Sequence, residues 1–174
     1  TTWSETGTEW LFPDTIQLRF KTHKDKDEFN YALYGKHTLL QLGSGSNTPL
    51  FVEIEKTGST GDANISLYIK DATPTGYQTA SINNVCILDD DFTSMMIRRN
   101  VSDDTNVENS YDLFVKKHKY GKLTINETAS IDTSLLTAPN ELAVNNSWTT
   151  ENKLYVGLGD NPSLEELIGS VGVM

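Results

Sequence analysis

A basic cluster is the first candidate for chemistry in this sequence. Residues 116–122 read KKHKYGK, in a chain that has 24 acidic against 14 basic side chains. Such a concentration of cations could hold a sulfated or carboxylated glycan through its local field and through counterion release. The alternative, which we favour, is a charged hairpin that turns at Tyr120 and Gly121 and whose lysines protect an edge strand. The anionic-glycan candidates are Lys116, Lys117, Lys119 and Lys122.

Catalytic and metal-binding side chains are sparse. The histidines His23, His37 and His118 lie in separate segments without metal-ligand spacing, and no Gly-x-Ser-x-Gly motif positions a nucleophile. A retaining glycosidase on a jelly-roll scaffold needs carboxylates that alternate along one strand face about 5 Å apart. Glu53 and Glu55 supply only two, on the exposed side of an ordinary strand. We predict that the chain is not an enzyme, with a jelly-roll glycosidase as a distant alternative.

Two further motifs are better explained by a structural role than by a metal site or a reactive group. Residues 89–91 are three consecutive aspartates, and consecutive residues of an extended chain point in alternating directions, so a solvated turn is favoured over a metal site. Asp103 and Asp104 are interpreted in the same way. Cys86 lies in the apolar run 84–88 without nearby cations, which predicts a small buried hydrophobe rather than a reactive thiol.

The stretch 154–169, LYVGLGDNPSLEELIG, has the order of a phosphate cradle: a strand, Gly-x-Gly, then a possible helix. A dinucleotide fingerprint would also need a third glycine near Pro162, a long helix and a parallel β-α-β unit, and these are missing. We predict instead a strand that ends at Gly157 and Gly159, one helical turn from Ser163, and a closing strand from Ile168.

The elements that must position these groups have a period of two. Ile16, Leu18 and Phe20 share one face of a strand and polar residues share the other, as a half-buried antiparallel strand requires. The β-compatible segments are 15–21, 50–56, 65–69, 95–99, 111–116 and 122–125. Many short strands without a long helix indicate an all-β antiparallel sandwich or barrel. The polar segments 101–110 and 128–148 are predicted excursions from the sheets.

Length and composition restrict the function further. The 174 residues suit one domain, and the net charge of −10 argues against general binding of nucleic acid or anionic membrane. We expect a soluble, excised piece of a larger protein, since a signal peptide and a run of about 20 apolar residues are both missing. Four N-glycosylation sequons favour an extracellular location, although the single cysteine alone would favour a reducing one. The sequons begin at Asn64, Asn100, Asn126 and Asn145.

The order of several motifs resembles a laminin G-like domain, also called an LNS domain, over nearly the whole chain. Residues 88–100 are similar to the family's Leu-x-Asp-Gly-x-Trp-His-x-Val-x-Val-x-Arg run, with Met95 and Ile97 in the two apolar positions. Phe92 and Thr93 replace Trp-His. The other segments that carry the resemblance are 14–22, 39–44, 50–54, 154–157 and 168–171.

This resemblance implies a jelly-roll β-sandwich of two antiparallel sheets and roughly a dozen strands, with at most one short helix and adjacent chain ends. It further implies that residues 1–174 form one domain of a secreted or single-pass membrane protein. Its function would be cell adhesion or receptor–ligand binding through the rim loops, with an extracellular protein as partner. Binding of a heparin-like glycan is the alternative, and neither nucleic acid nor direct membrane contact is expected.

No cofactor is implied beyond the single Ca²⁺ that many members of the family bind at the sandwich rim. The family's calcium positions fall near Leu50 and Thr149, and neither residue is a carboxylate, so no metal site is carried over. Glu151 or Asn145 could shift into the second position. Ser170 occupies the place of the family's C-terminal half-cystine, in agreement with a Cys86 that has no disulfide partner.

Overall fold

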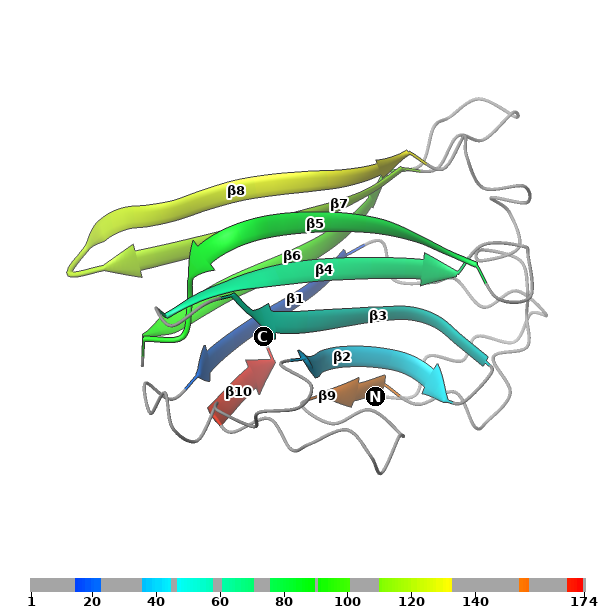
Figure 1. Cartoon of the computed structure of the whole chain (residues 1–174), viewed down its shortest axis with the longest axis horizontal. Helices are drawn as coiled ribbons and strands as arrows, with labels where there is room; N and C mark the ends of the chain where they lie inside the picture. Colours follow the sequence, from blue (N-terminus) through cyan, green and yellow to red (C-terminus); the bar gives the residue numbers. More distant parts are fainter. Residues whose placement is uncertain are drawn as a thin grey trace.

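A computed structural model describes residues 15–22, 36–44, 47–57, 61–70, 76–89, 91–100, 110–132, 154–156 and 169–173 (Figure 1). The regular structure of these residues is entirely β, and they include no helix long and apolar enough to cross a membrane. The strands are β1 (Thr15–Thr22), β2 (Lys36–Ser44), β3 (Asn47–Lys56), β4 (Asp62–Lys70), β5 (Tyr77–Cys86), β6 (Phe92–Asn100), β7 (Ser110–Lys119), β8 (Lys122–Asp132), β9 (Leu154–Val156) and β10 (Gly169–Val173).

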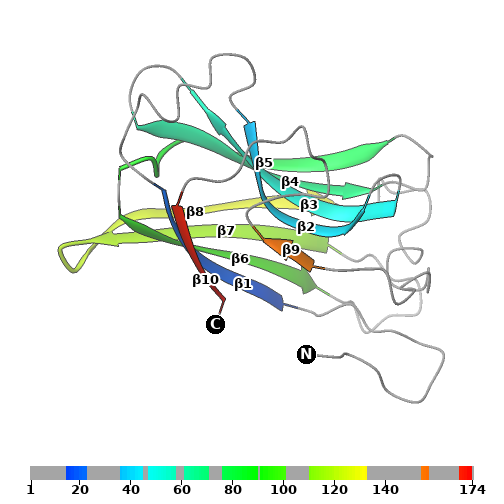
Figure 2. The ribbon, with the colours of Figure 1, turned by 90° about the horizontal axis from the view of Figure 1, so that it is seen from below.

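The strands form two antiparallel sheets that pack as two layers (Figure 2). Sheet A has the order β10-β1-β6-β7-β8, and sheet B has the order β5-β4-β3-β2-β9. The edge strand β5 of sheet B lies close to β7 and β8 of sheet A. The prediction of an all-β jelly-roll sandwich is therefore confirmed, and β1 pairs with β10.

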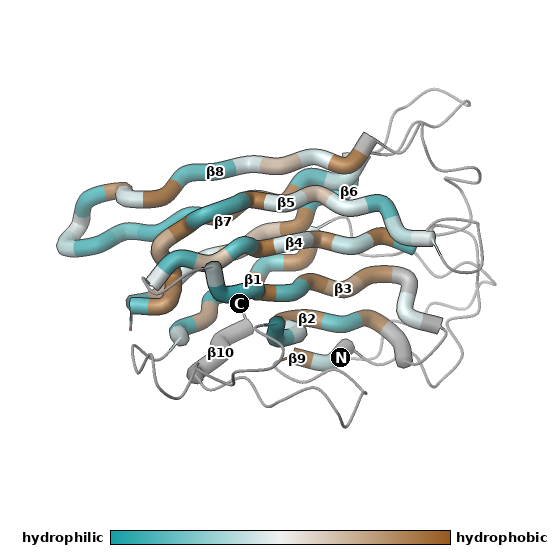
Figure 3. The backbone as a smooth tube through the Cα atoms, in the orientation of Figure 1, coloured by the Kyte–Doolittle hydropathy of each residue, from teal (hydrophilic) through white to brown (hydrophobic). Residues whose placement is uncertain are grey.

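Hydrophobic and hydrophilic residues alternate along the strands, as the brown and teal bands along the tube in Figure 3 show. This alternation decides which face of each strand enters the core. Leu18 and Phe20 of β1 are buried as predicted, and Ile16 packs against the same core from its edge. Met95 and Ile97 of β6 are also fully buried. Each such side chain contributes roughly 1.5–3 kcal/mol by leaving water, so the inward faces fix how the two sheets stack.

The strand bounds correct two expectations. β8 continues to Asp132, so residues 128–132 belong to sheet A rather than to the predicted excursion, of which residues 133–148 lie outside the described part. The hairpin between β7 and β8 turns at Tyr120 and Gly121, whose φ angles of 52° and 77° fit the tight turn predicted there. Of the excursion predicted at residues 101–110, Ser110 instead begins β7, and residues 101–109 lie outside the described part. The short helix predicted from Ser163 also lies outside the described residues.

The prediction that Cys86 is buried is wrong: its side chain is exposed. The reason is a β-bulge at Asn84, whose φ of 56° lies in the left-handed region that asparagine tolerates. The Asn84 backbone N–H donates to the side-chain oxygen of Asn64 at 3.0 Å on the neighbouring strand. The extra residue shifts the alternation by one, so that Ile82 and Val85 both point inward and Cys86 points outward.

The connection from β5 to β6 carries the chain from sheet B to sheet A. We call residues 86–89 the crossover segment. The backbone N–H groups of Ile87 and Leu88 both donate to the carbonyl of Gly61, at 3.2 and 2.9 Å. The hydroxyl of Thr22 on β1 donates to the carbonyl of Ile87 at 2.5 Å. Both sheets therefore hold this segment, which makes it a rigid base for the side chains that contact it.

Candidate functional site

The predicted basic cluster is divided between two faces of β7. Lys116 and His118 are exposed on the outer face of sheet A, whereas Lys117 and Lys119 point to the opposite side. Lys117 is only 2% exposed. Side chains alternate along an extended strand, so neighbouring lysines cannot share one surface. Lys122 is exposed near the hairpin turn, and the four lysines do not form a single binding patch.

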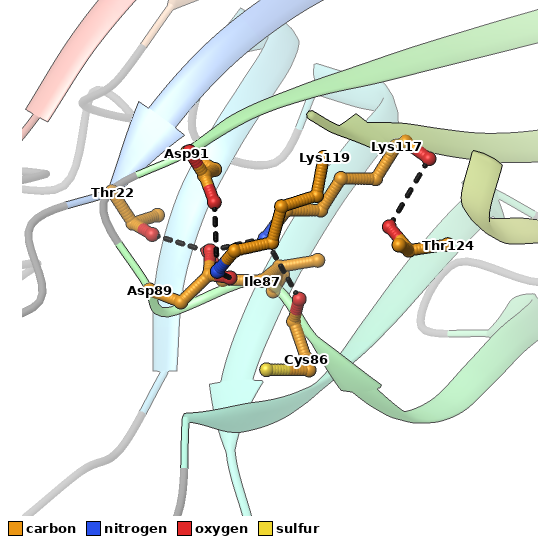
Figure 4. A network of polar contacts seen from close by, with 8 residues as sticks. All are labelled: Thr22, Cys86, Ile87, Asp89, Asp91, Lys117, Lys119 and Thr124. Atoms are coloured by element: carbon orange, nitrogen blue, oxygen red, sulfur yellow. Dashed lines mark hydrogen bonds and ion pairs between the residues drawn. The ribbon is translucent and has the colours of Figure 1, made fainter. Parts of the chain in front are cut away.

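The two inward lysines are held by Asp89 of the crossover segment and by Asp91, two residues farther along the chain (Figure 4). The ammonium group of Lys117 donates to the carbonyl of Cys86 at 3.0 Å and forms an ion pair with Asp89. Lys119 pairs with Asp89 at 3.4 Å and with Asp91 at 3.0 Å. The hydrogen bonds that Lys119 donates to Asp91 and then to Asp89 raise the pKa of Lys119, so it stays charged at neutral pH. Asp89 and Asp91 are thus ion-pair partners rather than members of a merely solvated turn.

This arrangement is a structural support, because its charges neutralise one another at short range. The Asp89 side chain is 17% exposed and that of Lys117 is 2% exposed, so neither is presented to a ligand. Lys116 and Lys122 are the members of the predicted set that keep exposed side chains without such partners in the described structure.

A different set of cations gathers on the outer face of sheet A. Along register rows, Arg19 of β1 lies opposite Ser94 of β6, which lies opposite Lys116 of β7. Arg98 lies two rows away on β6. The described outward side chains of this sheet include one carboxylate, Asp112, and four cations. We call these cations the basic face: Arg19, Lys21, Arg98 and Lys116.

Aromatic rings hold two of the arginines in place. The guanidinium of Arg19 lies 4.5 Å from the ring centroid of Phe92, and that of Arg98 lies 5.0 Å from the ring centroid of Phe114. Arg98 also donates to Asp112 at 2.8 Å, and Asp112 accepts a further hydrogen bond from Ser130 at 2.7 Å. Cation–π contacts of this kind orient a guanidinium without removing its charge. Arg19 therefore presents its donors to solvent in a defined position.

The sequence did not identify the basic face, because its members are far apart in the chain and meet only through strand register. The sequence did show that Arg19, Lys21 and Arg98 occupy the polar positions of strands in which polar and apolar residues alternate. That pattern gives the face of each strand but not which strands are neighbours. The position of Lys116 beside Arg19 follows from the order β1-β6-β7.

The remaining predicted positions have varied surroundings. Leu50, at one family calcium position, is 1% exposed and belongs to the core, while Thr149, Glu151 and Asn145 lie outside the described residues. Within the described part of the chain, no group of three or more His, Cys, Asp or Glu side chains could hold a metal ion. His37 is buried on β2 and His118 is exposed on β7. His23 lies outside the described residues.

Two of the four sequon asparagines have described side chains. Asn126 on the edge strand β8 is exposed, and Asn64 on β4 is half-buried with its oxygen accepting from the Asn84 amide. The side chain of Asn100 and the whole of Asn145 lie outside what the structure describes, as do Gly157 and Gly159.

Comparisons with known proteins give little beyond the fold. No family model and no curated protein sequence matches the chain. Among solved structures, the alginate lyase from Klebsiella pneumoniae is similar with a TM-score of 0.41 and 8% sequence identity. The similarity covers 72% of this chain and 45% of the lyase, so the chain spans less than half the length of that enzyme.

Proposed function

We propose that this jelly-roll domain is a non-catalytic recognition module that binds an anionic glycan across the basic face. The observation that supports this proposal is the charge of that face: among its described outward side chains, four cations lie on the same side of sheet A as one carboxylate, in a chain whose net charge is −10. A local positive field on an acidic protein attracts polyanions to that surface and repels them from the rest.

The geometry of the basic face suits sulfate or carboxylate groups. Arg19 and Lys116 occupy one register row with β6 between them, which places their strands about 10 Å apart. A linear polyanion that crosses the strands would meet both cations. Guanidinium groups bind planar or tetrahedral anions through two parallel hydrogen bonds, and the ring of Phe92 pre-orients Arg19 for this contact.

We include in this proposal the laminin G-like family and the extracellular location that the sequence implies. Support for a laminin G-like domain comes from residues 88–100, in which Met95 and Ile97 occupy the motif's apolar positions on the inward face of β6. In this proposal the domain serves cell adhesion or receptor–ligand recognition in an extracellular protein. Protein recognition through the rim loops stays a prediction, and the loop residues 101–109 and 133–153 lie outside the described part.

Neutralising the basic face should weaken retention on immobilised heparin. We expect the double variant Arg19→Gln/Lys116→Gln to bind about tenfold more weakly than the unmodified protein at low salt. The slope of log affinity against log salt should fall by about one per ion contact removed. The measurement uses bacterially produced protein without glycans, because Asn126 lies opposite Lys116 in the strand register and a glycan there would cover the same face.

The matched control is Lys36→Gln/Lys70→Gln, which removes the same charge from the outer face of sheet B. Retention should change by less than twofold in that variant. Equal losses in both double variants would show that only net charge matters, and full retention after loss of Arg19 and Lys116 would contradict the proposal.

Glycan occupancy tests the extracellular part of the proposal. When the chain is secreted from a eukaryotic cell, we expect a mass decrease on enzymatic removal of N-glycans from at least one of Asn64, Asn100 and Asn145. The Asn126→Gln variant should show the same decrease, because a glycan on Asn126 would cover the basic face beside Lys116. An unchanged mass in the unmodified protein would remove the main support for the extracellular location.

A further inference from the structure

Three aromatic side chains gather on the outer face of sheet B, on the opposite layer from the basic face. Phe51 of β3 and Tyr68 of β4 lie directly opposite each other in the register, and their rings stack with centroids 4.4 Å apart and 8° between planes. Tyr77 of β5 meets both rings edge-on, with centroid distances of 5.1 Å to Phe51 and 6.4 Å to Tyr68. We call these three residues the aromatic cluster.

The ring of Tyr77 lies down along the sheet. Its hydroxyl donates to the backbone carbonyl of Thr48 on β3 at 3.0 Å, although β4 lies between β5 and β3. Two strand spacings amount to about 10 Å, which a tyrosine side chain with its hydrogen bond spans only when it lies nearly parallel to the sheet. The angles of 77° and 85° to Phe51 and Tyr68 agree with one flat ring beside two upright ones. Tyr77 is 36% exposed, which agrees with a flat ring that has one face toward solvent.

Polar side chains lie on one side of the cluster, beyond Phe51 and Tyr68 and away from Tyr77. Thr79 of β5 lies beside Tyr68, and the next outward row consists of Glu53, Ser66 and Ser81. The hydroxyls of Ser66 and Ser81 are 2.8 Å apart and form a hydrogen bond. Donors and acceptors thus lie next to the apolar ring faces.

Charge distinguishes this surface from the basic face. The described outward side chains of sheet B combine the cations Lys36 and Lys70 with three carboxylates, Glu53, Glu55 and Asp62. Burial, followed by the charge of Glu53, raises the pKa of Tyr68, and burial raises the pKa of Tyr77. Both phenols are therefore neutral at physiological pH and keep their hydroxyl protons. A polyanion would be repelled here, whereas an uncharged ligand would not.

We propose that the aromatic cluster and its polar surroundings form a second binding site, on the outer face of sheet B, for a neutral oligosaccharide. A sugar ring has an apolar face of C–H groups and a rim of hydroxyls, so it needs a flat aromatic surface with hydrogen-bond partners around it. The Tyr77 ring supplies the surface, and Glu53, Ser66 and Ser81 supply acceptors and donors along one row that lies two outward rows from Tyr77. Those two rows span about 13 Å along the strands, which an oligosaccharide of several sugars can bridge. The site does not depend on the basic face, which lies on the other sheet.

Isothermal titration with neutral hexasaccharides of glucose and of mannose tests this site. We expect the unmodified protein to bind at least one of them, and Tyr77→Ala to weaken that binding at least tenfold. Phe92→Ala is the matched control, because it removes an exposed aromatic ring from sheet A and should leave sugar binding unchanged. If neither hexasaccharide binds, or if Tyr77→Ala binds as the unmodified protein does, the proposal is overturned.

A second variant keeps the test informative if Tyr77→Ala unfolds. Thr79→Arg adds bulk at an exposed position beside Tyr68 without removing a ring, and it should abolish sugar binding while the melting temperature stays within about 2 °C. A cluster that only stabilises the sheet would leave sugar binding unaffected by this change, and such a result overturns the proposal. Binding of a proline-rich peptide without any sugar response would also overturn it, since polyproline helices dock on aromatic surfaces too.

The two binding proposals can fail separately. Arg19→Gln/Lys116→Gln should bind the neutral hexasaccharide normally, and Tyr77→Ala should be retained on heparin normally. A loss of both activities in either variant would indicate a shared structural defect and would contradict the assignment of two distinct sites.

Discussion

Replacement of Lys117 by alanine is expected to lower the free energy of unfolding by about 3 kcal/mol, because it leaves Asp89 in a largely buried place without its main cation. The change also removes the donor that Lys117 provides to the carbonyl of Cys86. Lys119, at 3.4 Å from Asp89, stays in place and keeps the loss at the low end of the range for broken buried ion pairs. Urea denaturation followed by circular dichroism measures the effect.

Lys116→Ala is the control for this prediction, since it changes the adjacent residue on the exposed side of the same strand. Its effect should stay within about 0.5 kcal/mol. The double variant Lys117→Met/Asp89→Asn should be more stable than Lys117→Ala, because it also removes the carboxylate charge that has lost its main cation. Equal stability losses for Lys116→Ala and Lys117→Ala would contradict the structural role given to Lys117.

Lys116 and Lys117 lie on opposite faces of β7, and this difference shows which structural features a sequence pattern can and cannot predict. Alternation along residues 15–21 and 95–99 predicted the inward faces of β1 and β6, because each face is set by the pleat of a single strand. The same alternation separates Lys116 from Lys117, so the division of the basic cluster followed from a local rule. The ion pair between Lys117 and Asp89 does not follow from such a rule. Asp89 comes close to β7 only because the chain passes from sheet B to sheet A between β5 and β6.

Other features of the candidate sites depend on contacts that no local pattern contains. The segment QTASINN of β5 is polar and rich in small residues, so it was not predicted as a strand, although its outward residues lie beside the aromatic cluster. The exposure of Cys86 depends on a bulge that Asn64 stabilises from the neighbouring strand. Arg19 and Lys116 share one face only through the order of three strands. Strand order and register arise from packing between distant segments.

The two proposed binding faces also differ in how far the sequence could predict them. The sequence predicted an anionic-glycan site made of four neighbouring lysines, whereas the basic face combines cations from β1, β6 and β7. The proposed ligand, an anionic glycan, is the same in both cases. The aromatic cluster had no counterpart in the sequence, because Phe51, Tyr68 and Tyr77 come from three strands with no shared spacing. A jelly-roll sandwich exposes two broad sheet faces, and in this chain each carries a different chemistry.

Gly61→Ala is expected to lower the free energy of unfolding by about 2 kcal/mol through overpacking against the crossover segment. A Cβ at this position would lie 2.8 Å from the carbonyl oxygen of Leu88 and 3.4 Å from its carbonyl carbon. Those atoms are backbone, and the hydrogen bonds from Ile87 and Leu88 to Gly61 hold them in place. Relief of the clash would therefore require the connection between the sheets to shift, together with its contact to Thr22.

Gly121→Asn separates this effect from the general cost of replacing a glycine. A Cβ at Gly121 would meet nothing within 4 Å, and asparagine tolerates the φ of 77° at this position. Gly121→Asn should therefore change the free energy of unfolding by no more than about 0.5 kcal/mol. The midpoint of urea unfolding should fall for Gly61→Ala with an unchanged dependence on denaturant, which indicates a loss of native packing rather than a change in the unfolded state. Equal midpoints for the two variants would show that the crossover segment shifts at little cost. The inference that this segment is a rigid base for the ion pair of Lys117 and Asp89 would then be wrong.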